Sequence, residues 1–126
     1  MIYLASPYTA ANPLIMETRY LEACAAVAYA TDERTTVYSP IVHYHQVAKF
    51  GELPTDFQFW QRHNRHTLNL AEALWVLILP GWEHSVGVQA EIDYAAEIYR
   101  PIKAMIKTGP LAYRIELWGS FVDEKN

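Results

Sequence analysis

Cysteine and positive charge are both scarce in this chain of 126 residues. Cys24 is its single cysteine, which excludes an intrachain disulfide framework and a zinc site built on several thiolates. Ten Lys and Arg residues stand against 14 Asp and Glu residues, for a formal net charge of -4. This balance argues against a broad basic surface for a nucleic acid polymer, although individual anions remain candidate ligands.

Long apolar runs are absent as well. The longest strongly apolar segment, residues 73–79, is far shorter than the roughly 20 residues that a membrane span needs. The N-terminus carries no basic flank or cleavage motif of a secretion signal. We therefore expect a cytoplasmic protein without a membrane partner. With 52% hydrophobic residues and no repeat, linker or low-complexity tract, residues 1–126 are expected to form one domain.

The order of the predicted elements indicates an α/β fold. Short apolar or β-branched segments predict strands at residues 1–5, 35–38, 73–79 and 101–106, and helical spacing or helix-start signals predict helices at 13–31, 56–72 and 85–99. Residues 41–55 lack a clear period and are predicted as a binding loop or a short extra helix. Continuous apolar strands alternating with helices are typical of a three-layer Rossmann-like or flavodoxin-like sandwich with a parallel sheet of four to five strands.

The segment after residue 109 is too apolar for a disordered end. It is predicted either to cap the sheet or to contact another subunit.

Polar residues follow the predicted strands where parallel sheets bind ligands, beyond their carboxyl ends. This rule selects residues 6–9, 39–45 and 81–91. Ser85 opens a helix, whose free N–H groups favour an anion, and Gly87 allows a ligand to approach the backbone closely. Glu91 lies on the second turn and is expected to point into the same cleft. The alternative is that Ser85 is an ordinary N-cap and Glu91 a surface acid.

Histidines and aromatic residues near this edge have two interpretations each. His43 and His45 alternate, and His63 and His66 lie one helical turn apart, but no matching carboxylate motif accompanies them. We therefore expect no metal, and imidazoles that face solvent or contact substrate. Tyr8 and Trp82 flank the predicted cleft, where they either stack on a planar base or pack in the core or at its rim.

Three motifs together resemble the nucleoside 2-deoxyribosyltransferase superfamily, which includes the 2'-deoxynucleoside 5'-phosphate N-hydrolases. They are IYLASP at residues 2–7, the apolar strand that ends in Pro80-Gly81, and S-x-G-x-x-x-E at residues 85–91. The phrases SPIVH at 39–43 and GWEHS at 81–85 are most similar to a bacterial and phage branch. The resemblance covers roughly residues 1–105.

The resemblance implies a nucleotide N-glycosidase that cleaves a (deoxy)nucleoside 5'-monophosphate without a metal or organic cofactor. Glu91 matches the carboxylate that attacks the anomeric carbon and forms a covalent glycosyl ester, and Tyr3 matches the tyrosine that orients it. Ser85 matches the phosphate-contacting serine of the hydrolases. The substrate-binding residues expected around them are Ser6, Pro7, Tyr8, His43, His45, Trp82, His84, Ser85 and Gly87.

One position departs from the family pattern. Members usually carry an aspartate near the departing base, seven residues ahead of the position of Ala73, where this chain has His66. A histidine can donate a proton near neutral pH, so His66 is a third candidate catalytic residue with a changed base preference. A nucleotide-binding or sensing protein without turnover and a base-exchanging transferase are the alternative functions.

The resemblance also implies self-association. We expect a homodimer or larger homo-oligomer with the apolar tail, or the helix that carries His63 and His66, at the interface. The alternative is that the tail folds back on its own sheet.

Overall fold

A five-stranded sheet between helical layers forms the domain in the computed structural model, which describes residues 1–125. Along the chain the elements are β1 (Ile2–Ala5), α1 (Pro13–Ala30), β2 (Val37–Tyr38), α2 (Pro40–Gly51), α3 (Phe57–Leu70), β3 (Ala73–Leu77), the 3-10 helix η1 (Trp82–His84), α4 (Val86–Glu97), β4 (Ile102–Gly109), β5 (Ala112–Leu117) and α5 (Trp118–Lys125). The strand order is β2-β1-β3-β4-β5. The first four strands are parallel, and β5 runs antiparallel to β4. The α/β prediction is confirmed, with a mixed rather than purely parallel sheet.

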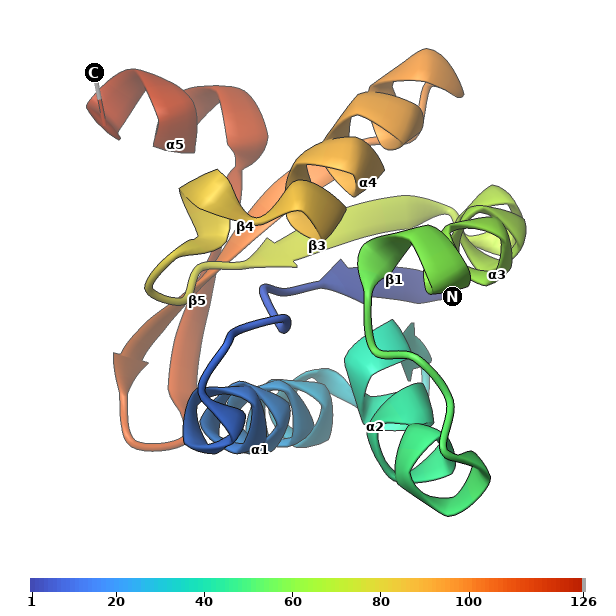
Figure 1. Cartoon of the computed structure of the whole chain (residues 1–126). Coiled ribbons are helices and arrows are strands. Elements are labelled where there is room, and N and C mark those ends of the chain that lie inside the picture. The colour runs from blue at the N-terminus through green and yellow to red at the C-terminus, as the bar shows by residue number, and fades with distance from the viewer. Residues whose placement is uncertain (126) are drawn as a thin grey trace.

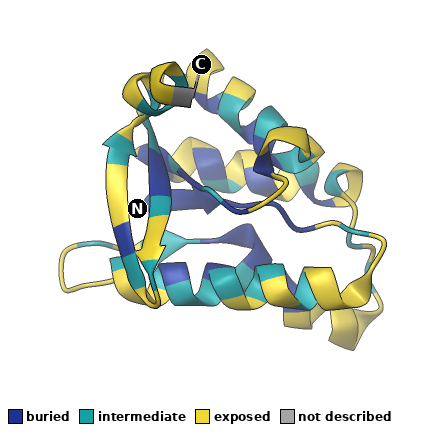
Figure 2. Cartoon of the chain, turned by 90° about the vertical axis from the view of Figure 1, so that its left-hand side faces the viewer, coloured by how far each residue is buried: buried dark blue, intermediate teal, exposed yellow. Residues whose placement is uncertain are grey.

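Helices cover both faces of the sheet, with α1 and α2 on one side and α3, α4 and α5 on the other (Figure 1). Successive strand residues point to opposite faces, so each central strand contributes to two cores. Tyr3 and Val76 belong to the core under α3 and α4, whereas Leu4 and Leu77 belong to the core against α1. Buried residues accordingly gather in the central strands and on the inward faces of the helices (Figure 2).

Each of the four longest helices begins at a polar side chain that caps it. Asn12, Ser39, Asp56 and Ser85 accept hydrogen bonds from backbone N–H groups in the first turns of α1, α2, α3 and α4. Such caps satisfy N–H groups that have no partner within the helix. Helix α2 therefore starts directly after β2, whereas α4 starts after β3 and the short 3-10 helix η1.

Residues 40–51 form helix α2, in the region where the sequence predicted either a binding loop or a short extra helix. Ser39 Oγ accepts from Val42 N at 3.2 Å, and Pro40 occupies the first helical turn, where its missing N–H costs nothing. The helix ends at Gly51, and the next residue, Glu52, caps it in a left-handed conformation with φ of 52°. Its inward residues Tyr44 and Ala48 pack in a third core cluster beside α1.

The apolar tail extends the sheet and then packs against it. Strand β5 pairs with β4, with Met105 opposite Ile115. The rings of Trp118 and Phe121 in α5 lie 5.6 and 5.9 Å from the ring of Trp82. The tail thus caps its own sheet, as one of the two expected arrangements has it. No helix among residues 1–125 has the length and hydropathy needed to cross a membrane.

Candidate active site

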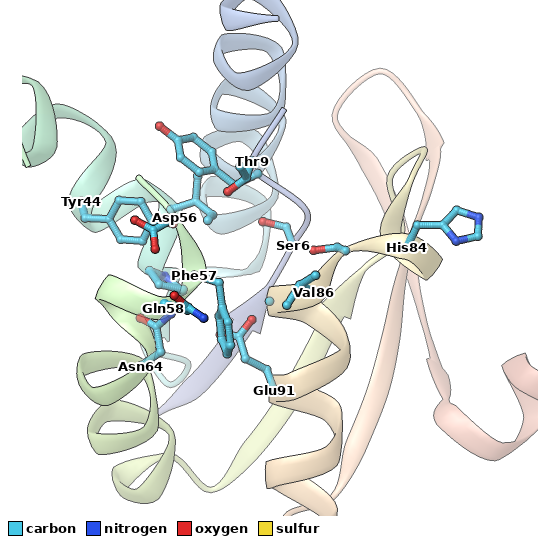
Figure 3. Close-up of a pocket in the computed structure, with 15 residues that line it drawn as sticks. Ser6, Thr9, Tyr44, Asp56, Phe57, Gln58, Asn64, His84, Val86 and Glu91 are labelled. Carbon is cyan, nitrogen blue, oxygen red and sulfur yellow. The ribbon is translucent and has the colours of Figure 1, made fainter. Parts of the chain in front are cut away.

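A cavity of about 410 Å³ opens at the carboxyl ends of β1 and β3. In the sheet, β2 lies on one side of β1 and β3 on the other, so the direction of the strand order changes between β1 and β3. Open α/β sheets bind ligands at such a switch point. Six of the predicted site residues line it: Ser6, Tyr8, His84, Ser85, Gly87 and Glu91. Helices α2 and α3 provide the opposite wall (Figure 3).

Glu91 and Tyr3 form a buried pair at this cavity. Glu91 lies on the second turn of α4, lines the cavity and is only 7% exposed. Tyr3 lies in β1, is fully buried and donates a hydrogen bond from its hydroxyl to Glu91 Oε2. The surface-acid interpretation of Glu91 is therefore wrong, because the strand and helix hold its carboxyl group inside the protein.

Burial shifts the proton equilibria of both groups. Removal from water raises the pKa of Glu91 to about 8, although the hydrogen bond from Tyr3 opposes the shift. Burial, and then the charge of Glu91, raises the pKa of Tyr3 well above its ordinary value. The Tyr3 hydroxyl consequently stays protonated and donates, whereas Glu91 exchanges its proton near neutral pH.

The raised pKa of Glu91 predicts how stability depends on pH. Between about pH 4.5 and 8 the folded protein keeps a proton that the unfolded chain has released, so the free energy of unfolding falls as pH rises through this window. Each unit of pKa shift corresponds to about 1.4 kcal/mol. Since Glu91→Gln removes the titrating group, its melting temperature is expected to rise steadily relative to that of the wild type from pH 5 to pH 8.5. Thermal unfolding followed by circular dichroism measures this, and a constant difference would contradict it.

The start of α4 forms a wall rich in hydrogen-bond donors. Ser85 Oγ accepts from Val88 N at 3.3 Å, so Ser85 is an N-cap and lines the cavity at the same time. Gly87 is the second residue of the helix, among the first-turn amides that carry the positive end of the helix dipole. Ser6, which follows β1, also lines the cavity; it is 4% exposed, and its hydroxyl has no hydrogen-bond partner among the described residues. A ligand in the cavity would contact polar groups from the segment after β1 and from the start of α4.

Polar and aromatic groups from α2 and α3 complete the cavity. Tyr44 stacks on Trp60 with ring centroids 4.3 Å apart, and Asn64 is buried beside Glu91. Asp56, the cap of α3, lies at the cavity with its carboxylate exposed. The labelled side chains of Tyr44, Asp56 and Asn64 gather on the side facing Ser6 and Glu91 (Figure 3).

A chain of hydrogen bonds supports the Tyr8 side of the cavity. The Tyr8 hydroxyl lies 2.6 Å from His45 Nδ1, and His45 Nε2 lies 2.8 Å from Glu17 Oε2. Because a carboxylate only accepts, Nε2 donates to Glu17, and Nδ1 of the neutral ring accepts from Tyr8. His45 is 3% exposed and does not line the cavity, so it positions Tyr8 from behind.

Other predicted residues lie away from the cavity. His66 is exposed on α3, and it follows Asn64 by two residues, which rotates it by about 200° around the helix. His43 lies on α2 outside the cavity. Pro7 is fully buried, and Trp82 packs against Trp118 in the core. The structure therefore does not bring these four residues together with Glu91. His84 lines the cavity, although its imidazole points away from Glu91 (Figure 3).

Asn64 and Asp56 are cavity residues that sequence reasoning missed. Asn64 is a polar residue on the face of the predicted 56–72 helix that also carries Trp60 and Leu68. A polar side chain on a buried face that does not cap a helix is a signal for a binding site. Asp56 is the first residue of that predicted helix. A capping role accounts for an aspartate there, so the sequence did not indicate that it also lines the cavity. No group of three or more His, Cys, Asp or Glu side chains within residues 1–125 could hold a metal ion.

Comparison with known proteins gives one family. No curated protein sequence matches the chain. A family model described as a domain of unknown function, DUF1937, matches residues 1–107, which cover all elements through most of β4 and include Tyr3, Ser85 and Glu91. The chain therefore belongs to the DUF1937 family.

Proposed function

We propose that the protein is a nucleotide N-glycosidase that cleaves the bond between base and sugar in a (deoxy)nucleoside 5'-monophosphate. The observation that carries this proposal is the buried Tyr3–Glu91 pair at a cavity that the start of α4 also lines. The pair supplies a carboxyl group held in one orientation, and the helix start supplies N–H groups for a phosphate. The resemblance of Tyr3, Ser85 and Glu91 to residues of the nucleoside 2-deoxyribosyltransferase superfamily supports the same function.

The reaction follows the retaining route. A Glu91 carboxylate oxygen attacks the anomeric carbon while the bond to the base nitrogen breaks, and the base leaves with the bonding electrons and takes up a proton from solvent, to which the attacking water of the next step returns one. Water then attacks the same carbon, releases the sugar phosphate and regenerates the carboxylate. Tyr3 holds one carboxylate oxygen, so the other remains available for attack. Asn64, beside Glu91, offers an amide that can hydrogen-bond to the base but cannot transfer a proton to it.

Nucleotide binding without turnover is the second candidate function, and the position of His66 favours it. A leaving base needs a proton, and His66 lies on the far side of α3 from Glu91. Asp56 and His84 are the titratable side chains at the cavity besides Glu91 and the tyrosines.

A transferase would use the same ester but pass the sugar to a second base.

A panel of ribo- and deoxyribonucleoside 5'-monophosphates tests the proposal. Each is incubated with the purified protein, and free base is separated by chromatography. We expect at least one nucleotide to yield base and sugar phosphate in equal amounts. A competing base in the mixture separates the routes, since base exchange in place of hydrolysis indicates a transferase. Nucleotide binding without release of any base would favour the binding protein.

The start of α4 predicts a preference for monophosphates over nucleosides. In the non-hydrolysing Glu91→Gln background we expect a monophosphate to bind at least about tenfold more tightly than its nucleoside, because the helix amides and Ser85 stabilise the phosphate. Ser85→Asp should remove this preference through charge repulsion, while aspartate still caps the helix. Isothermal titration calorimetry measures both affinities.

Ser85→Asn provides the matched control, since asparagine caps equally well and adds no charge. It should retain most of the preference. Equal affinity of the parent protein for a nucleoside and its monophosphate would remove the phosphate from the proposal.

A further inference from the structure

A second pocket of about 410 Å³ lies between α2 and α3, at the edge of the sheet formed by β2. Its walls include His43 from α2, Tyr38 from β2, and Arg62, His63 and His66 from α3. It shares no lining residue with the Glu91 cavity. The structure thus brings three of the five histidines of the chain together, although the sequence places them on two separate helices.

The charged and polar groups of this pocket suit an anion. Arg62 is permanently cationic, and the three imidazoles present N–H donors. Among the described residues, no carboxylate lines the pocket. A metal ion would meet the guanidinium of Arg62 without a negative ligand to offset it, so a cation is disfavoured there.

Aromatic rings form the remaining walls. The ring of Tyr38 lies 5.8 Å from that of His43, and the ring of Trp60 lies 5.4 Å from that of His63. Tyr38 comes from β2 and Trp60 from α3. Aromatic faces of this kind pack favourably against a planar apolar body. The volume falls within the range of pockets that hold small organic ligands.

The pocket adjoins the back of the Glu91 cavity without opening into it. Trp60 stacks on Tyr44, which lines the Glu91 cavity, with centroids 4.3 Å apart. Tyr38 packs against Tyr3, the partner of Glu91, with centroids 5.8 Å apart. The Tyr44–Trp60 and Tyr3–Tyr38 contacts therefore lie between the two sites. Because the sites share no lining residue, a ligand in one contacts different side chains from a ligand in the other.

We propose that the pocket lined by His43, His63, His66 and Arg62 is a second binding site, for a small planar molecule that carries an anionic group such as a phosphate or carboxylate. The anion contacts Arg62 and the imidazoles, and the planar part packs against Tyr38 and Trp60. This inference is independent of the reaction at Glu91, because it uses none of the residues of that cavity.

Histidine NMR signals test the proposal with phenyl phosphate as the probe. His43, His63 and His66 report on the second pocket, whereas His84 and, through its hydrogen bond with Tyr8, His45 report on the Glu91 cavity. We expect phenyl phosphate to shift the first three signals along one saturable curve. Inorganic phosphate and phenol, which each carry one half of the probe, should bind at least fivefold more weakly.

Arg62→Gln should weaken binding of phenyl phosphate at least fivefold. Arg65→Gln is the matched control, because it removes one positive charge from the same helix at a residue that packs on Tyr94 outside the pocket. Shifts confined to His84, shifts that do not saturate, or equal losses in the two arginine variants would overturn the proposal. A shift of the three signals on dilution without the probe would overturn it too, since a second copy of the chain would then occupy the pocket.

Discussion

Replacing Glu91 with glutamine is expected to lower the rate of base release by about a thousandfold or more, because the amide cannot act as the attacking carboxylate. The two side chains have nearly the same shape, and Glu91 is neutral in part of the ordinary pH range. The fold and the affinity for nucleotide should therefore change little. Chromatographic rates under single-turnover conditions measure the first effect, and calorimetry measures the second.

Glu97→Gln provides the control for this variant. Glu97 lies at the end of the same helix, is exposed and lies outside the cavity. Its substitution should leave the rate unchanged. A rate for Glu91→Gln close to that of the wild type would exclude Glu91 as the nucleophile, whatever the reaction.

The second large effect is expected in the pH dependence of the reaction. Attack requires the carboxylate form of Glu91, and burial raises the pKa of this group to about 8. Below this value kcat/KM should rise about tenfold per pH unit, which makes the reaction at pH 6 roughly 50-fold slower than at pH 8. Initial rates across pH 5.5 to 9.5 define the curve. A fall across the same range would mean that the protonated Glu91 is the active form.

Tyr3→Phe separates Glu91 from other titrating groups in this profile. The Tyr3 hydrogen bond lowers the pKa of Glu91, so its removal should raise that pKa further and move the rising limb to higher pH. The titration of the substrate phosphate would stay in place. A profile unchanged in Tyr3→Phe would assign the rising limb to a group other than Glu91.

The fold class was readable from the sequence because its signals are local. Continuous apolar segments such as residues 1–5 identify strands that are buried on both faces, and β1 is buried throughout. Asn12-Pro13 and Ser85 place helix starts because capping involves neighbouring residues alone. The same local pattern placed Glu91 on the second turn of the helix that Ser85 starts, and the structure shows that Glu91 lines the cavity.

The tertiary structure decided what depends on distant partners. The tail becomes a strand and a helix because β4 offers an unpaired edge and Trp82 offers an apolar surface, neither of which is visible in the tail itself. The resemblance to the deoxyribosyltransferase superfamily selected His66, but α3 places Asn64 at the cavity with Glu91 and leaves His66 exposed on another side of the helix. Likewise, His43 joins His63 and His66 in one pocket only through the packing of α2 beside α3. Sequence separation fixes the order of side chains, whereas the phase of a helix and the neighbour it packs against determine which of them meet.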